Sequence, residues 1–219
     1  MTLTEKISNK VGIYARSILN VDEEKEMVIV YGAIGLLQII WSVLWTLAIS
    51  LIFRVVFEAM LFTIIVSILK KYSGGAHATS PSRCIFIGVT IAIFAGMIIK
   101  KFLFRQIFIV NLVLGIVCIF ISFLIIAKLA PVDSINKPIP SDKMRKRLNN
   151  TSKNIIIFYI LLMLTMIILY KISFKIYFLE AYECISLGAL WQSITLTNHA
   201  IKILNKVDFI LSFKNIKRR

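Results

Sequence analysis

The stretch Met27–Phe53, MVIVYGAIGLLQIIWSVLWTLAISLIF, contains no charged side chain. It is longer than the roughly twenty apolar residues that a helix needs to cross the bilayer core. It is also too long for the apolar region of a cleaved signal peptide, and the residues that precede it are polar and charged. The stretch therefore predicts a membrane-spanning helix.

Five further apolar runs follow along the chain. They are Val55–Leu69, Cys84–Ile99, Ile107–Ala127, Asn154–Tyr170 and Ile176–Ile201. The mean hydropathy of +0.85 and the 58% share of hydrophobic residues exceed those of a soluble domain. We expect an all-α, polytopic integral membrane protein with about six hydrophobic segments. The second and third runs are short, so whether they span the bilayer fully stays open.

Ahead of the first span, apolar side chains recur every three or four positions. They are Ile7, Val11, Tyr14, Ile18 and Val21. This period is typical of an amphipathic helix lying in the membrane interface. The chain is thus expected to divide into a cytoplasmic amphipathic helix in residues 1–26, a membrane domain in residues 27–201 and a basic tail in residues 202–219.

Lys and Arg are distributed unevenly between the ends of the expected spans. With a cytoplasmic N-terminus and six alternating helices, 20 of the 26 basic residues lie on the cytoplasmic side. Short cytoplasmic loops are the ones enriched in Lys and Arg. We therefore expect both termini, the loop 70–84 and the basic loop 128–153 to be cytoplasmic. The net charge of +15 favours membrane lipids or an acidic peptide as partner over nucleic acid.

The polar loop 70–84 contains one of the two histidines and one of the three cysteines, His77 and Cys84. On one continuous helix their spacing would separate them by about 10 Å. Ser80 and Pro81 instead favour a helix that begins there, with Cys84 in its first turn. The loop can then bring the His77 imidazole close to the Cys84 thiol. The imidazole would accept the thiol proton and so activate the sulfur as a nucleophile. The helix N-terminus favours the thiolate as well.

Two neighbouring features could assist such a site. Gly74 and Gly75 let the backbone approach a substrate, so their N–H groups are candidate oxyanion donors. A basic group that follows the proline-containing segment 131–140 is a candidate for binding an anionic substrate, with lipid contact and topology as the alternative. It consists of Lys143, Arg145, Lys146 and Arg147.

A third catalytic residue is not evident, although Glu58 and Asp133 could orient the histidine. The other two cysteines lie in apolar runs, and neither a disulfide framework nor a metal site is indicated. No phosphate-binding loop occurs along the chain, and we expect no cofactor.

Two motifs resemble the accessory gene regulator protein B (AgrB) family. One is Gly74–Ala78 followed by Cys84, and the other is Ala130–Asp133 followed by Asn136–Ile139. The resemblance covers nearly the whole chain. It implies a cell-membrane cysteine endopeptidase of a Gram-positive bacterium, with His77 and Cys84 as its catalytic pair.

By the same resemblance, the substrate would be an AgrD-like propeptide with an acidic C-terminal tail. Removing that tail would lead to a cyclic thiolactone or lactone signal for quorum sensing. The resemblance also implies self-association, as a dimer. Two other readings of the chain are a small-peptide exporter and a non-catalytic scaffold. Neither of them needs a thiol at Cys84.

Overall fold

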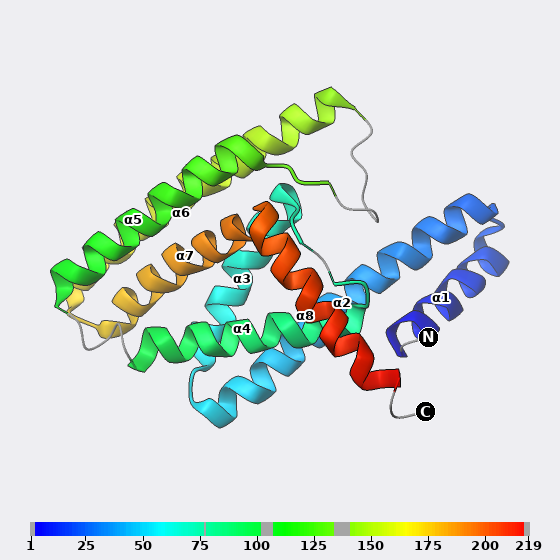
Figure 1. Cartoon of the computed structure of the whole chain (residues 1–219), viewed down its shortest axis with the longest axis horizontal. Coiled ribbons are helices and arrows are strands. Elements are labelled where there is room, and N and C mark those ends of the chain that lie inside the picture. The colour runs from blue at the N-terminus through cyan, green and yellow to red at the C-terminus, as the bar shows by residue number, and fades with distance from the viewer. Residues whose placement is uncertain (1–2, 77, 102–106, 134–140, 217–219) are drawn as a thin grey trace.

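The described part of the chain is built from helices, and no β-strand occurs in it. The computed structural model describes residues 3–76, 78–101, 107–133 and 141–216. Its helices, labelled in Figure 1, are α1 (Leu3–Leu19), α2 (Glu23–Phe53), α3 (Val56–Ser73), α4 (Pro81–Lys101), α5 (Phe108–Leu129), α6 (Asp142–Ser173), α7 (Ile176–Ile194) and α8 (Asn198–Ile216). The expected all-α fold is confirmed.

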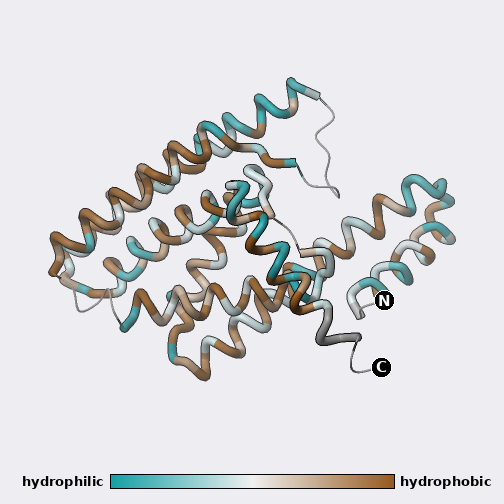
Figure 2. Tube along the Cα trace, in the orientation of Figure 1, coloured by the Kyte–Doolittle hydropathy of each residue, from teal (hydrophilic) through white to brown (hydrophobic). Residues whose placement is uncertain are grey.

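Four helices of the described residues, α2, α4, α5 and α6, are long and apolar enough to cross a membrane. Figure 2 shows mostly hydrophobic colour along α5 and the later turns of α6, whereas the first turns of α6 are hydrophilic. The chain is therefore a membrane protein. The first five expected apolar segments each correspond to one helix, and the sixth is divided between α7 and α8. Helices α3 and α7 are shorter and less apolar than the four spanning helices.

Helix α7 lies in the interior of the bundle, packed against α3, α5 and α6. The main core cluster joins these helices through side chains such as Leu69, Ile126, Tyr159 and Ala189. Because neighbouring helices cover it, α7 can hold polar side chains that would be unfavourable against lipid. Its Glu183 is only 2% exposed.

A smaller core cluster joins α2, α3 and α4. Val55, which directly precedes α3, and Ala59 of α3 pack there against Val89 and Ile93 of α4. Beside it lies Glu58, which is 1% exposed and whose Oε1 is 3.2 Å from the Lys100 Nζ. The lysine offsets a carboxylate that would otherwise be buried without a counter-charge.

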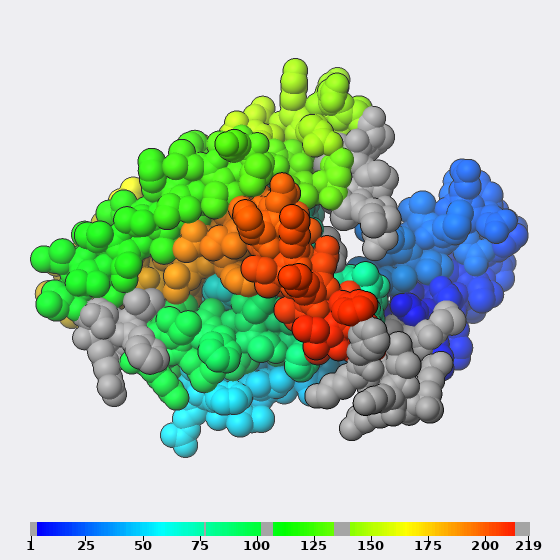
Figure 3. Space-filling model, viewed as in Figure 1, coloured from blue at the N-terminus to red at the C-terminus, as the bar shows by residue number. Residues whose placement is uncertain are grey.

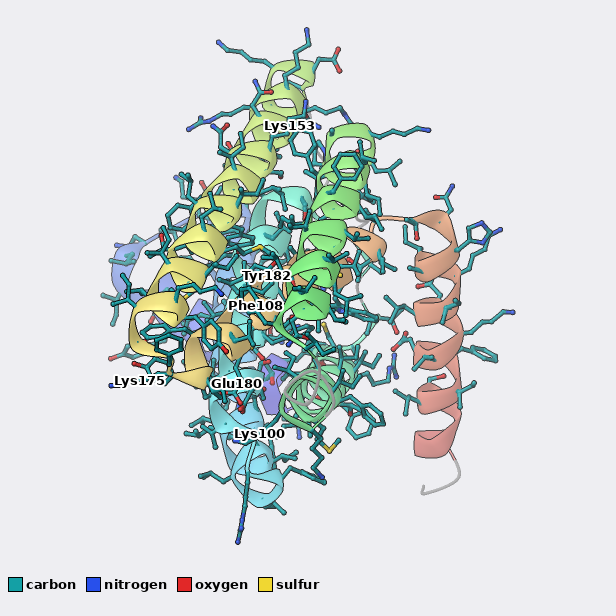
Figure 4. All side chains as sticks on the ribbon, turned by 90° about the vertical axis from the view of Figure 1, so that its left-hand side faces the viewer. Lys100, Phe108, Lys153, Lys175, Glu180 and Tyr182 are labelled. Carbon is teal, nitrogen blue, oxygen red and sulfur yellow. The ribbon has the colours of Figure 1, made fainter. Side chains whose placement is uncertain are left out.

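The helix ends fall on two sides of the bundle. Figure 4 shows Lys153 toward one end of the molecule and Lys100 and Lys175 toward the other. Helices α3, α5 and α7 all finish at the Lys153 end, where Ser73, Gly74 and Val132 meet. This convergence brings three connections of the chain together.

Helix α1 packs along the first turns of α2. Arg16 and Glu26 form an ion pair of 2.9 Å between them. Thr4 and Ser8 are buried, whereas the predicted apolar stripe is exposed. The exposed stripe residues are Ile7, Val11, Tyr14 and Ile18. The amphipathic helix thus turns small polar side chains toward the protein and apolar ones outward, as an interfacial helix does.

The run expected over Ile176–Ile201 is divided in the structure. Helix α7 ends at Ile194 and α8 begins at Asn198. The Thr195 hydroxyl donates to the Gln192 carbonyl at 2.7 Å, and the Thr197 hydroxyl donates to the Ile194 carbonyl at 2.8 Å. Such local side-chain bonds compete with helical ones and favour a helix end. Residues 198–216 form α8, which runs across the start of α4 (Figure 1).

Candidate active site

The loop between α3 and α4 begins with two glycines in conformations that other residues rarely adopt. Gly74 has φ +70° and Gly75 has φ +121°. A Cβ atom on Gly74 would lie 2.2 Å from the Val132 carbonyl oxygen, and one on Gly75 would lie 2.9 Å from the Thr195 hydroxyl. Both the backbone angles and the close approach of neighbouring segments therefore require glycine.

Helix α4 begins at Pro81, as the sequence predicts. The Cys84 N–H donates to the Ser80 carbonyl at 3.0 Å, which is the first bond of the helix. Cys84 is thus in the first turn, is partly exposed and carries a free thiol.

The segment that follows α5 holds one side of the loop. The Val132 N–H donates to the Ser73 carbonyl at 3.0 Å, and Gly74 and Val132 form an isolated parallel bridge. The Ala130–Pro131 peptide bond is cis. The described part of the second motif, Ala130–Asp133, therefore lies directly against Gly74, although almost sixty residues separate them in the chain. Asn136–Ile139 of the same motif lie outside the described residues.

The C-terminal end of α7 holds the other side. The Gln192 Nε2 donates to the Gly74 carbonyl at 2.8 Å and to the Ser73 hydroxyl at 3.0 Å. The Ala76 N–H donates to the Thr195 carbonyl at 3.3 Å. The first half of the loop is thus held on one side by the segment after α5 and on the other by the C-terminal end of α7.

The backbone amides of the loop have different partners. The Gly74 N–H donates to the Lys70 carbonyl at 3.0 Å, and the Ala76 N–H is bonded to Thr195. The described part of the chain supplies no acceptor for the Gly75 N–H. Of the two glycine amides expected as oxyanion donors, that of Gly74 is therefore already bonded within the protein, and that of Gly75, a buried residue, is not.

His77 lies outside the described residues. Its neighbour Ala76 is held through its N–H and also through its carbonyl, which accepts from the Lys70 Nζ at 3.1 Å. On the other side, the Thr79 N–H donates to the Asp208 carboxylate at 3.1 Å. The backbone is therefore held both before and after the histidine.

The basic group lies on the first turns of α6 and is exposed. It consists of Lys143, Arg145, Lys146 and Arg147. One member is paired, since the Arg145 guanidinium lies 2.7 Å from the Asp133 carboxylate. Asp133 directly follows Val132, so this ion pair joins the basic group to the segment that contacts the loop. The other three charges are available to a partner.

The two acids considered as orienting groups lie elsewhere. Glu58 is near the start of α3, about 22 Å of helix from Ser73 at its end, and is paired with Lys100. Asp133 is paired with Arg145. Sequence reasoning missed Gln192 and Asp208, which contact the loop. A signal for Asp208 was present, because it is the single acidic residue in α8.

Comparison with known proteins shows the family of this chain. The family model for accessory gene regulator B (AgrB) matches residues 2–196. The chain belongs to the AgrB family. An AgrB-like protein of Clostridium perfringens strain SM101 is 35% identical over 215 residues, covering 97% of this chain and 99% of its own. AgrB-like protein 2 of C. perfringens strain 13 is 36% identical over 214 residues, with the same coverage. No solved structure matches significantly.

Membership of the AgrB family links the chain to quorum sensing. The family takes part in processing a quorum-sensing propeptide and acts with an AgrD propeptide. The AgrB match ends at residue 196, within the connection between α7 and α8. Helix α8, with Asp208, lies beyond it.

Proposed function

We propose that this chain is a membrane-embedded cysteine endopeptidase that removes the C-terminal tail of an AgrD-like propeptide. Cys84 is the nucleophile and His77 is the general base. The observation that carries the proposal is the position of Cys84, in the first turn of α4 directly after a loop fixed by three other segments. Catalytic groups need such fixed placement to react efficiently.

In the first step, His77 takes the proton of the Cys84 thiol, and the sulfur attacks the carbonyl carbon before the tail. The Gly75 N–H donates to the oxygen that becomes negative in the tetrahedral intermediate. The peptide C–N bond then breaks. The tail leaves as an amine with the proton from His77, and the rest of the peptide stays on Cys84 as a thioester.

In the second step, an internal cysteine or serine of the peptide attacks the thioester and closes the ring. Its proton passes to His77, and the Cys84 thiolate is released. The thioester conserves the acyl-transfer energy, so the ring closes without a nucleotide cofactor. Water must be kept from the thioester, and a site at the edge of the bilayer favours cyclisation over hydrolysis.

The partners and the location follow from the same proposal. The exposed charges of Lys143, Lys146 and Arg147 attract the acidic tail of the propeptide, and the membrane lipids surround the apolar helices. Both termini and the site are on the cytoplasmic side of the cell membrane of a Gram-positive bacterium. The protein self-associates as a dimer.

The test uses the full chain co-expressed with a propeptide that carries a tag on its C-terminal tail. We expect loss of the tag with the unchanged protein and no loss with Cys84→Ala or His77→Ala. Cys118→Ala is the matched control, because that cysteine is in α5 and should leave cleavage unchanged. Equal membrane levels of all variants exclude a folding defect. Normal cleavage by Cys84→Ala would refute the peptidase.

The peptide exporter remains the second reading. One observation favours this reading. The carboxyl groups of Glu58 and Glu183 are buried, and acids inside a membrane domain often mark a transport pathway. An exporter would move the peptide without the Cys84 thiol. Export of an uncleaved propeptide by Cys84→Ser would therefore favour this reading.

A further inference from the structure

Helix α8 is joined to the start of α4 by one carboxylate. The Asp208 Oδ1 accepts from the Arg83 Nε at 2.6 Å. The Asp208 Oδ2 accepts from the Thr79 N–H at 3.1 Å and from the Thr79 hydroxyl at 2.6 Å. The Thr79 hydroxyl oxygen in turn accepts from the Arg83 Nη2. The three residues form a closed network between elements that are far apart in the sequence.

The Asp208 carboxylate of this network is largely covered from solvent, whereas Thr79 is exposed. Asp208 is 5% exposed, and the Arg83 side chain is 20% exposed. Figure 3 shows α8 lying on the surface next to α4. A buried carboxylate is unfavourable unless it is paired and hydrogen-bonded, and here both oxygens have partners. This is a specific contact and more than loose packing of a terminal helix.

Two residues of the network lie close to Cys84 in the sequence, so the network can affect the position of the thiol. Thr79 is the last loop residue before the helix-start pair Ser80–Pro81, and Arg83 directly precedes Cys84. The carboxylate therefore holds the chain on both sides of the point where the loop becomes α4. Any change in its bonds would shift the first turn of α4, and the thiol with it.

We propose that Asp208 is a positioning residue of the Cys84 site and that α8 is thereby part of the catalytic unit. Asp208 does not touch the reacting atoms. It acts through Thr79 and Arg83, which set the position of the Cys84 thiol relative to the loop. This inference rests on the proposed peptidase function, and it concerns a helix beyond the residues that the family model matches.

The charge state of Asp208 fits this role. Burial raises its pKa, but the hydrogen bonds from Thr79 and Arg83 outweigh burial and leave the pKa below its ordinary value. The side chain is thus an anion at neutral pH and attracts the Arg83 guanidinium. An asparagine of the same size would keep one acceptor but lose the charge and the second acceptor.

The experiment compares Asp208→Asn and Asp208→Glu in the full chain, with Lys206→Gln as the matched control. Lys206 is an exposed charged residue of the same helix. Propeptide cleavage is measured as kcat and KM. We expect Asp208→Asn to lower kcat by about tenfold or more with little change in KM, because a misplaced nucleophile slows the chemical step. Asp208→Glu should recover part of kcat, and Lys206→Gln should not change it.

A second readout does not depend on peptidase activity. In a chain with Cys118→Ala and Cys184→Ala, Cys84 is the single thiol, and its alkylation by iodoacetamide can be timed. We expect Asp208→Asn to change this rate by about threefold or more relative to Lys206→Gln, which follows from the dependence of thiol reactivity on its surroundings. An altered rate in a protein that cleaves no propeptide would support the link and refute the proposed function.

Unchanged kcat and unchanged alkylation in Asp208→Asn would overturn the inference and leave the peptidase intact. If Asp208→Asn fails to accumulate in the membrane, Arg83→Lys provides the second variant. It keeps the positive charge but cannot reproduce the guanidinium geometry. A loss of kcat with Arg83→Lys supports the inference, and wild-type kcat and alkylation overturn it.

Discussion

The side-chain amide of Gln192 donates to the carbonyl of Gly74 at 2.8 Å, across 118 positions of the sequence. The same amide donates to the hydroxyl of Ser73, and both Gln192 and Ser73 are almost fully buried. One side chain of α7 thus fixes the first two residues of the turn that leads to the candidate site.

Gln192→Leu keeps a similar volume but removes both donated bonds. Since the Gly74 carbonyl and the Ser73 hydroxyl are then left without this donor, we expect the free energy of unfolding to fall by about 1–3 kcal/mol. Cleavage should fall as well. Thermal unfolding in detergent and tag-loss assays measure the two effects. Gln38→Leu, on α2, is the matched control. Wild-type stability of Gln192→Leu would show that these bonds do not hold the loop.

Gly74→Ala and Gly88→Ala add the same methyl group in different surroundings. At Gly74 the new carbon meets the Val132 carbonyl at 2.2 Å and the φ is +70°, whereas nothing lies within 4 Å at Gly88. We expect Gly74→Ala to displace the loop and abolish most cleavage. Gly88→Ala in α4 should retain activity, and it should stabilise the helix by about 0.4–1 kcal/mol. Similar cleavage by both variants would contradict the steric argument.

Neutralising Lys143, Lys146 and Arg147 together should weaken propeptide capture more than the chemical step. Their charges attract the acidic tail over a Debye length of about 8 Å in physiological salt. In single-turnover assays we expect a higher apparent Kd with a smaller salt dependence and an almost unchanged rate at saturation.

The matched control for this charge effect neutralises Lys101, Lys171 and Lys175 at the opposite end of the bundle. That triple variant should bind as the unchanged protein does. If its affinity falls equally, the effect is one of overall charge and the basic group has no special role.

Orientation in the membrane is tested with single cysteines on a background free of other reactive thiols. Phe174 is 76% exposed between α6 and α7, at the end expected to lie outside. An impermeant thiol reagent added to intact cells should label Phe174→Cys and should not label Lys146→Cys. The reverse result would invert the expected topology and put the loop 70–84 outside.

The Asp208 network should contribute equally to stability at every pH from 5 to 8. Because the pKa of Asp208 is lowered from 3.8, its contribution is complete above that value and is lost as the pH falls through the lower folded-state pKa. The difference in Tm between the unchanged protein and Asp208→Asn should therefore be constant between pH 5 and 8 and disappear in stronger acid. A difference that changes near pH 6 would mean that another group controls the contact.

Much of the fold could be predicted from the sequence because bilayer length and apolar composition are local properties. The span Met27–Phe53 lies within α2, and the Ser80–Pro81 pair marks the start of α4 as expected. The division of the run Ile176–Ile201 was not predicted, although Thr195, Thr197 and Asn198 lower the hydropathy at the break. Its cause is hydrogen bonding by Thr195 and Thr197, which composition does not reveal.

Only the part of the candidate site formed by residues close together in the sequence could be predicted. His77 and Cys84 lie seven positions apart, so a motif was visible. The contacts that hold the loop come from Val132, Gln192 and Asp208, and each depends on how the helices pack. The sequence alone does not show which residues, far apart along the chain, come into contact. Whether His77 reaches the Cys84 thiol stays a prediction.

The order of synthesis gives these contacts a further consequence. The loop leaves the ribosome early, but Val132, Gln192 and Asp208, which hold it, all follow it in the chain. Because translation proceeds from the N-terminus, the thiol of Cys84 is made long before its surroundings exist. A chain interrupted before α8 would carry the Cys84 thiol without the contacts that Asp208 makes to Thr79 and Arg83. The candidate site thus begins in the first half of the described chain and is completed by a helix that is synthesised after the other seven.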